Sequence, residues 1–139
     1  MSGKAEPAGL APGLRATVTA DVTDADTAVA LGSGDVPVLG TPRLLALAEA
    51  ATVAAVEPQL AAGQTTVGMA VSLEHSRPSP VGAPVRVEAE LTQVTGRKLV
   101  FNFIAYGAGE GDDAVLGAGT VERVLVDRDR FVARATGSA

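Results

Sequence analysis

The sequence contains no cysteine and no tryptophan, and aromatic residues make up only 3% of its 139 residues. Without cysteine there is no disulfide, no thiolate metal site and no cysteine nucleophile. Because 47% of the residues are nevertheless hydrophobic, we expect a core built from valine, leucine and alanine. A chain of this length is long enough for one domain with such a core.

Positive charge is also scarce, since 11 Lys and Arg face 16 Asp and Glu, for a net charge of −5. Nucleic acids and anionic membranes are bound by clustered cations, so we expect neither as a partner. A phosphate-bearing ligand held by a few arginines stays compatible with this charge. No run approaches the roughly 20 apolar residues of a membrane span, and "MSGKAEPAGLAPG" lacks the apolar centre of a signal peptide. We therefore expect a cytoplasmic protein.

Motifs for metals, cofactors and serine hydrolases are missing as well. One histidine and scattered carboxylates give no metal-ligand cluster, so we expect no metal. No G-x-S-x-G elbow is present. The glycines of "GAGEG" at 107–111 stand in an acidic stretch that no helical pattern follows, which argues against a phosphate loop. We expect no cofactor.

Alternation of apolar and polar residues predicts β-strands along much of the chain. The expected strands cover residues 14–21, 65–75, 85–94, 98–106 and 114–127. Residues 27–31 form a possible short additional strand. The later strands follow one another through short connections, which favours antiparallel pairing.

Residues 41–58, "TPRLLALAEAATVAAVEP", have the composition of a helix. Thr41 is the expected N-cap, the proline after it suits the first helical position, and Pro58 sets the end. Because nearly all side chains are apolar, we expect a core helix with Glu49 at least partly buried in its middle. A carboxylate buried there needs a partner or a function.

One long central helix wrapped by an antiparallel sheet is an α+β arrangement, the hotdog fold. We expect this domain to cover residues 14–131. The Gly-, Ala- and Pro-rich residues 1–13 and the tail 132–139 are expected to be flexible.

His75 is the only histidine. It shares strand parity with Val67, Met69, Val71 and Leu73, so we expect it to point toward the helix, where it could meet Glu49 as an acid–base pair. The alternative is a core histidine satisfied by the backbone.

Three further residues admit a structural reading beside a functional one. The hydroxyl of Thr41 could act beside the free N–H groups of a helix start, or could serve only as a cap. Glu49 could be an exposed residue or a member of a structural ion pair. Arg123 in "GAGTVER" reads as a solvated strand residue that could also form an ion pair or meet a phosphate.

Taken together, these segments resemble the hotdog-fold acyl-CoA thioesterases, in particular the branch that includes the fluoroacetyl-CoA thioesterase. The resemblance covers residues 14–131 and lies in the helix with Thr41 and Glu49 eight residues apart, in "VGMAVSLEHSRPSPVG", and in "LGAGTVER". It implies that Thr41, Glu49 and His75 are the catalytic residues. It also places the Gly68 backbone beside the thioester.

The resemblance implies hydrolysis of a small or medium acyl-CoA by a homodimer, possibly a tetramer, with coenzyme A as part of the substrate. Gly40, Gly68 and Arg77 are expected to contact that substrate, Arg77 as a cation for CoA. The fluoroacetyl-CoA enzyme has an aromatic-rich lid, whereas "DTAVALGSGDVPVLG" at 26–40 has no aromatic residue, which argues against fluoroacetyl specificity.

Two other functions compete with this one. A catalytically silent hotdog protein would bind acyl-CoA or another small apolar molecule and would tolerate loss of Glu49. A hotdog hydratase typically pairs Asp with His in one short motif, and "LEHSRP" has no Asp beside His75.

Overall fold

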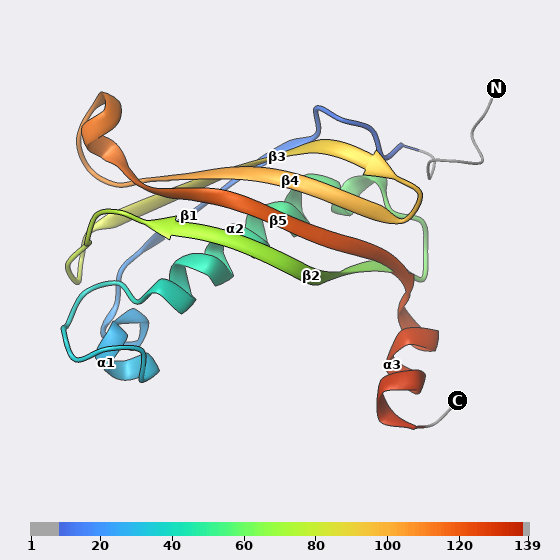
Figure 1. Ribbon diagram of the computed structural model, residues 1–139, viewed down its shortest axis with the longest axis horizontal. Helices are drawn as coiled ribbons and strands as arrows, with labels where there is room; N and C mark the ends of the chain where they lie inside the picture. Colours follow the sequence, from blue (N-terminus) through green and yellow to red (C-terminus); the bar gives the residue numbers. More distant parts are fainter. Residues whose placement is uncertain (1–8, 138–139) are drawn as a thin grey trace.

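Helix α2 (Thr41–Val56) lies in the hollow of a five-stranded sheet that curls around it, as Figure 1 shows for the computed structural model, which describes residues 9–137. The elements in chain order are β1 (Arg15–Asp21), the 3₁₀ turn η2 (Asp24–Asp26), α1 (Ala28–Leu31), α2, the 3₁₀ turn η3 (Glu57–Gln59), β2 (Gln64–His75), β3 (Pro84–Thr95), β4 (Lys98–Tyr106), the 3₁₀ turn η4 (Gly111–Ala114), β5 (Val115–Asp127) and α3 (Arg128–Thr136). This arrangement confirms the α+β hotdog layout.

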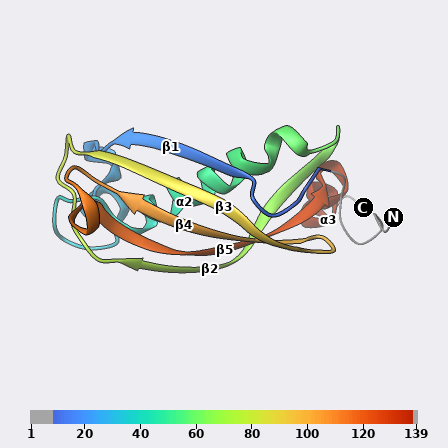
Figure 2. The same cartoon turned by 90° about the horizontal axis from the view of Figure 1, so that it is seen from above.

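The strand order is β1-β3-β4-β5-β2, and every neighbouring pair is antiparallel. Strands β3 and β4 form a hairpin whose turn contains Gly96 at φ +61°, a conformation that glycine adopts without strain. Seen from above in Figure 2, the sheet leads from β1 to β2, and these two strands are its edges. Strand β2 therefore has an unpaired side in the single chain.

The core lies between α2 and the sheet. The helix buries one face, and the central strands β3 and β4 supply apolar side chains opposite it. The buried residues of the helix are Leu44, Leu47, Ala48, Ala51, Thr52, Ala55 and Val56. Phe101 and Phe103 are the largest fully buried side chains, and most of the remaining core is aliphatic.

The predicted strands and the long helix appear within two residues of their expected bounds, and the helix ends at Val56, just before the turn that contains Pro58. The prediction of an additional strand at residues 27–31 is wrong. Thr27 caps a short helix there by accepting a hydrogen bond from the Ala30 N–H at 3.2 Å, and Gly32 ends it at φ +71°. These local caps outweigh the weak strand pattern.

The prediction that Val67, Met69, Val71 and Leu73 share one face of β2 is also wrong. A β-bulge between Gly68 and Ala70 shifts the register against β5, so that residues before and after it alternate out of phase. Met69 and Val71 are 57% and 48% exposed, whereas Leu73 packs on the core.

The face of α2 that carries Glu49 is not buried in the single chain either. Val53 is 37% exposed, Leu45 is half-buried, and Ala46 and Ala50 are exposed. The expected core helix is therefore covered on one side only, because the sheet of one chain reaches around one side.

Residues pack or form a helix close to both expected domain boundaries, at 13 and 131. Leu10 is buried, and the Gly13 N–H donates to the Leu91 carbonyl at 2.8 Å. Helix α3 spans the boundary between residues 131 and 132. Residues 1–8 and 138–139 of the expected flexible segments lie outside the described residues. No helix in the described part of the chain is long and apolar enough to cross a membrane.

Candidate active site

Thr41 and His75 meet at one end of the molecule, where α2 begins and β2 ends. The Thr41 hydroxyl and His75 Nδ1 are 2.9 Å apart, and the tautomer of the ring decides which of them donates the hydrogen bond. Nε2, the other ring nitrogen, is buried and bonds to none of the described residues. Burial lowers the pKa of the His75 imidazole below its ordinary 6.5, and the Arg77 backbone offsets part of this shift. His75 is therefore a neutral imidazole at neutral pH.

Thr41 is not the N-cap that the sequence predicts. The cap is Gly40, and Thr41 is the first helical residue, so its hydroxyl is available to His75. Gly40 lies so close to α1 that an added Cβ would stand 2.9 Å from Leu31 Cδ1 and 3.2 Å from the Ala28 backbone. A side chain does not fit at this position, and the helix therefore begins at a glycine N-cap that has no side-chain hydrogen bond.

The start of α2 offers one free amide. The Gly40 N–H donates to the Asp26 carbonyl at 2.9 Å, Pro42 has no N–H, and the Arg43 N–H donates back to Gly40 at 3.0 Å. The Thr41 N–H has no acceptor among residues 9–137, as expected for a first-turn amide. A hydroxyl and an amide of the same residue thus lie at the positive end of the helix.

Glu49 has a different partner from the one expected. Its Oε2 accepts from Arg123 Nη1 at 3.3 Å, and no hydrogen bond or ion pair joins it to His75 within the described residues. The Glu49 side chain is 36% exposed, so the carboxylate is partly buried, as expected. Gly68 lies beside it, since an added Cβ there would stand 2.6 Å from Oε2.

Arg123 and Thr66 were not predicted as site residues. The Arg123 side chain is only 8% exposed, so it is not the solvated strand residue that its charge suggests. The sequence does hold a signal for it, because Val121, Arg123 and Leu125 share one parity in β5 and the other two are core residues. An arginine on the apolar face of a strand needs an acceptor inside the protein.

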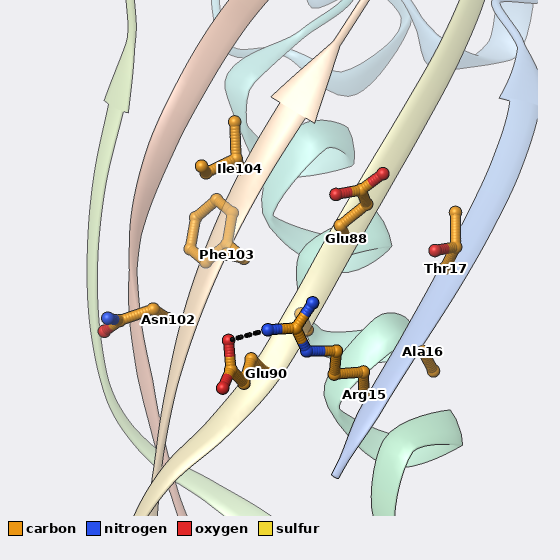
Figure 3. Close-up of a pocket in the computed structure, with 9 residues that line it drawn as sticks. Arg15, Ala16, Thr17, Glu88, Glu90, Asn102, Phe103 and Ile104 are labelled. Carbon is orange, nitrogen blue, oxygen red and sulfur yellow. Dashed lines mark ion pairs between the residues drawn. The ribbon is translucent and has the colours of Figure 1, made fainter. Parts of the chain in front are cut away.

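Two cavities of similar size lie on different sides of the molecule. One, of about 380 Å³, opens at the Thr41–His75 pair and is also lined by Gly40, Ser76 and Arg77. The other, of about 390 Å³, lies over β1, β3 and β4, and its rim carries the 3.1 Å ion pair between Arg15 and Glu90 (Figure 3). Only the first contains residues predicted from the sequence to act on a substrate.

The predicted residues thus form two clusters. Thr41, His75, Gly40 and Arg77 surround the first cavity, while Glu49 and Gly68 lie together near Arg123. Thr41 and Glu49 are eight residues apart on one helix, which corresponds to about 12 Å along its axis. Among the described residues no three of His, Cys, Asp and Glu gather in a way that could hold a metal ion.

Comparison with known proteins identifies the family of this chain. The model of a family described as fluoroacetyl-CoA-specific thioesterase, FlK, matches residues 22–129. This chain belongs to the FlK family. Membership in that family makes the protein an acyl-CoA thioesterase, a hydrolase of the hotdog thioesterase superfamily.

Individual relatives resemble the chain in sequence and in structure. The fluoroacetyl-CoA thioesterase of Streptantibioticus cattleyicolor is 35% identical over 97 residues, which cover 70% of this chain and 67% of the relative. A variant of the thioesterase FlK, solved with acetyl-CoA, is 27% identical with a TM-score of 0.83 and covers 94% of this chain and 99% of its own. A thioesterase superfamily member from Thermus thermophilus, 24% identical with a TM-score of 0.83 and 93% of both chains covered, shares the fold.

Proposed function

We propose that this FlK-family thioesterase hydrolyses CoA thioesters of small or medium aliphatic acids, at a site that two copies of the chain build together. The observation that carries the proposal is the contact between Thr41 and His75 at the positive end of α2, with Glu49 two turns further along the same helix. A thioester hydrolase needs donors for the oxyanion and a base or nucleophile for the carbonyl carbon. Thr41 supplies the first and Glu49 the second.

In the proposed reaction, the Thr41 hydroxyl and N–H donate to the thioester oxygen as it becomes negative. Glu49 either takes a proton from the attacking water or attacks the carbonyl carbon itself to give an acyl-enzyme that water then cleaves. The C–S bond breaks, the acyl group takes the OH of the water molecule and leaves as the free acid, and the CoA thiolate takes up the remaining proton of that water and leaves as the thiol. His75 orients the Thr41 hydroxyl by donating its Nδ1–H to the Thr41 oxygen, which leaves the Thr41 proton for the thioester oxygen.

The need for two copies follows from the distance between the clusters. A reacting carbonyl has to lie about 3 Å from both the donors and the base, whereas Thr41 and Glu49 of one chain are about 12 Å apart along α2. A two-fold axis beside the free edge of β2 would pair this strand with its copy in the antiparallel sense. That pairing turns the Gly68 end of one strand toward the His75 end of the other, so that Glu49 of the partner reaches the Thr41–His75 pair.

The surface of the single chain supports this homodimer. Met69 and Val71 are exposed on the edge strand β2, and Leu45 and Val53 flank Glu49 on the uncovered face of α2. An exposed apolar edge strand is a liability that assembly removes, and two-fold pairs are the commonest assembly. A tetramer of two such dimers is the alternative that a mass measurement distinguishes.

The proposed acyl class rests on the segment above the Thr41–His75 cavity. Residues 26–40 contain no aromatic residue. Ala28, Val36 and Val38 of this segment give the cavity an apolar wall, and Ser33 and Asp35 line it as well. Such a wall suits a short alkyl chain through apolar contact. Arg77 lines the same cavity and is the proposed contact for a phosphate of CoA, with Gly40 and Gly68 as backbone contacts.

The test is thiol release from acyl-CoAs ranging from acetyl to decanoyl, with fluoroacetyl and aryl examples, by wild type and Glu49→Gln. We expect the highest kcat/KM on short or medium alkyl groups and a loss of orders of magnitude in the variant. Saturable acyl-CoA binding without thiol release in either protein would instead identify a silent binding module. A strong preference for fluoroacetyl-CoA would overturn the proposed acyl class alone.

A further inference from the structure

Arg123 is a cation on the apolar side of β5 that the proposed reaction does not use. Only 8% of its side chain is exposed, and its backbone pairs with Gly68 of β2. Burial lowers the pKa of the guanidinium, and the nearby Glu49 carboxylate raises it again. An arginine keeps its charge even so, and a buried charge without acceptors would be strongly destabilising.

Thr66 holds the guanidinium in one orientation. Arg123 Nε donates to the Thr66 hydroxyl at 2.8 Å, and Nη2 donates to the Thr66 carbonyl at 3.0 Å. Two bonds to one residue of the neighbouring strand fix the plane of the guanidinium. Of its remaining N–H groups, Nη1 donates to Glu49 Oε2 at 3.3 Å.

The two oxygens of Glu49 are in different environments. Oε2 accepts from Arg123 and lies over Gly68, whose missing side chain leaves the room it needs. Oε1 accepts no hydrogen bond from the residues that the structure describes, and the side chain is 36% exposed. One oxygen is thus anchored while the other is available to a water molecule or a thioester.

We infer that Arg123 is the positioning residue for Glu49, and that Thr66 acts through Arg123 to keep the carboxylate aimed at the reacting carbonyl. This inference rests on the proposed function. Arg–carboxylate pairs are frequently bidentate, with both carboxylate oxygens engaged, whereas Arg123 reaches only one oxygen of Glu49. Here the arginine directs two donors to Thr66 and one to Glu49, which orients the carboxylate without blocking it.

The sharpest test changes Thr66, which does not itself contact Glu49. Thr66→Val removes the hydroxyl that fixes Arg123 and keeps the shape of the side chain, whereas Thr66→Ser keeps the hydroxyl. We expect Thr66→Val to lower kcat about tenfold with KM within about threefold, because a misplaced catalytic group affects the chemical step more than binding. We expect Thr66→Ser to recover most of that loss.

Arg123→Lys tests the positioning residue directly. A lysine keeps the charge but loses the planar fork, so we expect kcat to fall about 10- to 100-fold with KM again little changed. Glu122→Gln is the matched control, since Glu122 precedes Arg123 in β5 and pairs instead with Lys98 at 3.1 Å. Melting temperatures of all variants separate a loss of fold from a loss of kcat.

The outcomes separate this inference from the proposed function. If wild type is active and Glu49→Gln is not, but Thr66→Val and Arg123→Lys keep wild-type kcat, the positioning role is overturned and the reaction stands. Equal losses in Thr66→Val and Thr66→Ser, or losses that follow the melting temperature, also contradict it. Wild type without thiol release on any substrate would overturn both.

Discussion

Thr41 and His75 are 34 residues apart in the sequence, and their side chains are joined by a 2.9 Å hydrogen bond. The contact forms because α2 begins where β2 ends, so that a helix start with a free N–H lies beside the only imidazole of the chain. In the proposed reaction, this hydroxyl acts only while the histidine keeps it oriented.

Thr41→Val is expected to lower kcat about a hundredfold, because one oxyanion donor is lost from a preorganised site. Thr41→Ser keeps the hydroxyl but not the methyl group and is expected to lose far less. Steady-state thiol release measures both. Since Thr41 is exposed and a Gly40 backbone caps the helix, the melting temperature is expected to stay close to that of wild type in both variants. Wild-type turnover in Thr41→Val would remove Thr41 from the site.

The lowered pKa of His75 predicts a dependence of stability on pH. Between the folded-state pKa and the ordinary value of 6.5, the unfolded chain binds a proton that the folded chain does not. The free energy of unfolding therefore falls as the pH drops below 6.5. Urea unfolding at pH 7.5 and pH 5.5 measures this drop, which we expect to be smaller in His75→Gln. Equal drops in the two proteins would show that His75 titrates normally in the fold.

Gly68→Ala is expected to lower kcat at least about tenfold, because the added methyl group would stand 2.6 Å from Glu49 Oε2 and push the carboxylate aside. The double variant Gly68→Ala with Glu49→Gln serves as the control. If the glycine acts through Glu49, the two effects are strongly non-additive and the double variant resembles Glu49→Gln alone. Additive losses would point to a separate role for the Gly68 backbone, such as contact with the thioester.

The dimer is tested at the edge of β2. Val71→Asp places a charge on the exposed edge strand, and we expect it to shift the mass in sedimentation from dimer to monomer with loss of thiol release. Ile104→Asp is the matched control, since Ile104 is 40% exposed on β4 in the middle of the sheet. A wild-type monomer with full activity would contradict both the dimer and the shared site.

Mixing two inactive variants tests whether the site is shared. Thr41→Val and Glu49→Gln each damage both sites of their own homodimer. In a mixed dimer, one site receives both altered residues and the other receives neither, if Thr41 and Glu49 of a site come from different chains. We therefore expect thiol release to return after unfolding and refolding the two variants together. No recovery, with mixed dimers shown by differently tagged chains, would place both residues of a site in one chain.

The sequence by itself determined the architecture and the short list of site residues. Alternating side chains set the strands, a proline near the start and another at the end set α2, and an unpaired carboxylate among apolar neighbours singled out Glu49. These features are local, because each depends on residues a few positions apart. Thr41 and His75 could be located as a helix start and a strand end, but their catalytic assignment came from the resemblance to the hotdog-fold thioesterases.

Only the tertiary structure decided which of these residues meet. Strand parity placed His75 on the side of α2, and there it meets Thr41, but Glu49 lies two turns further along the helix and Arg123 is its partner. Thr27 caps a short helix where the pattern predicted a strand. Gly40, which α1 packs against, is the N-cap of α2 in place of Thr41. Pairings between β2, β5 and α2 join residues up to 74 positions apart, and such contacts depend on packing and register, which no local pattern encodes.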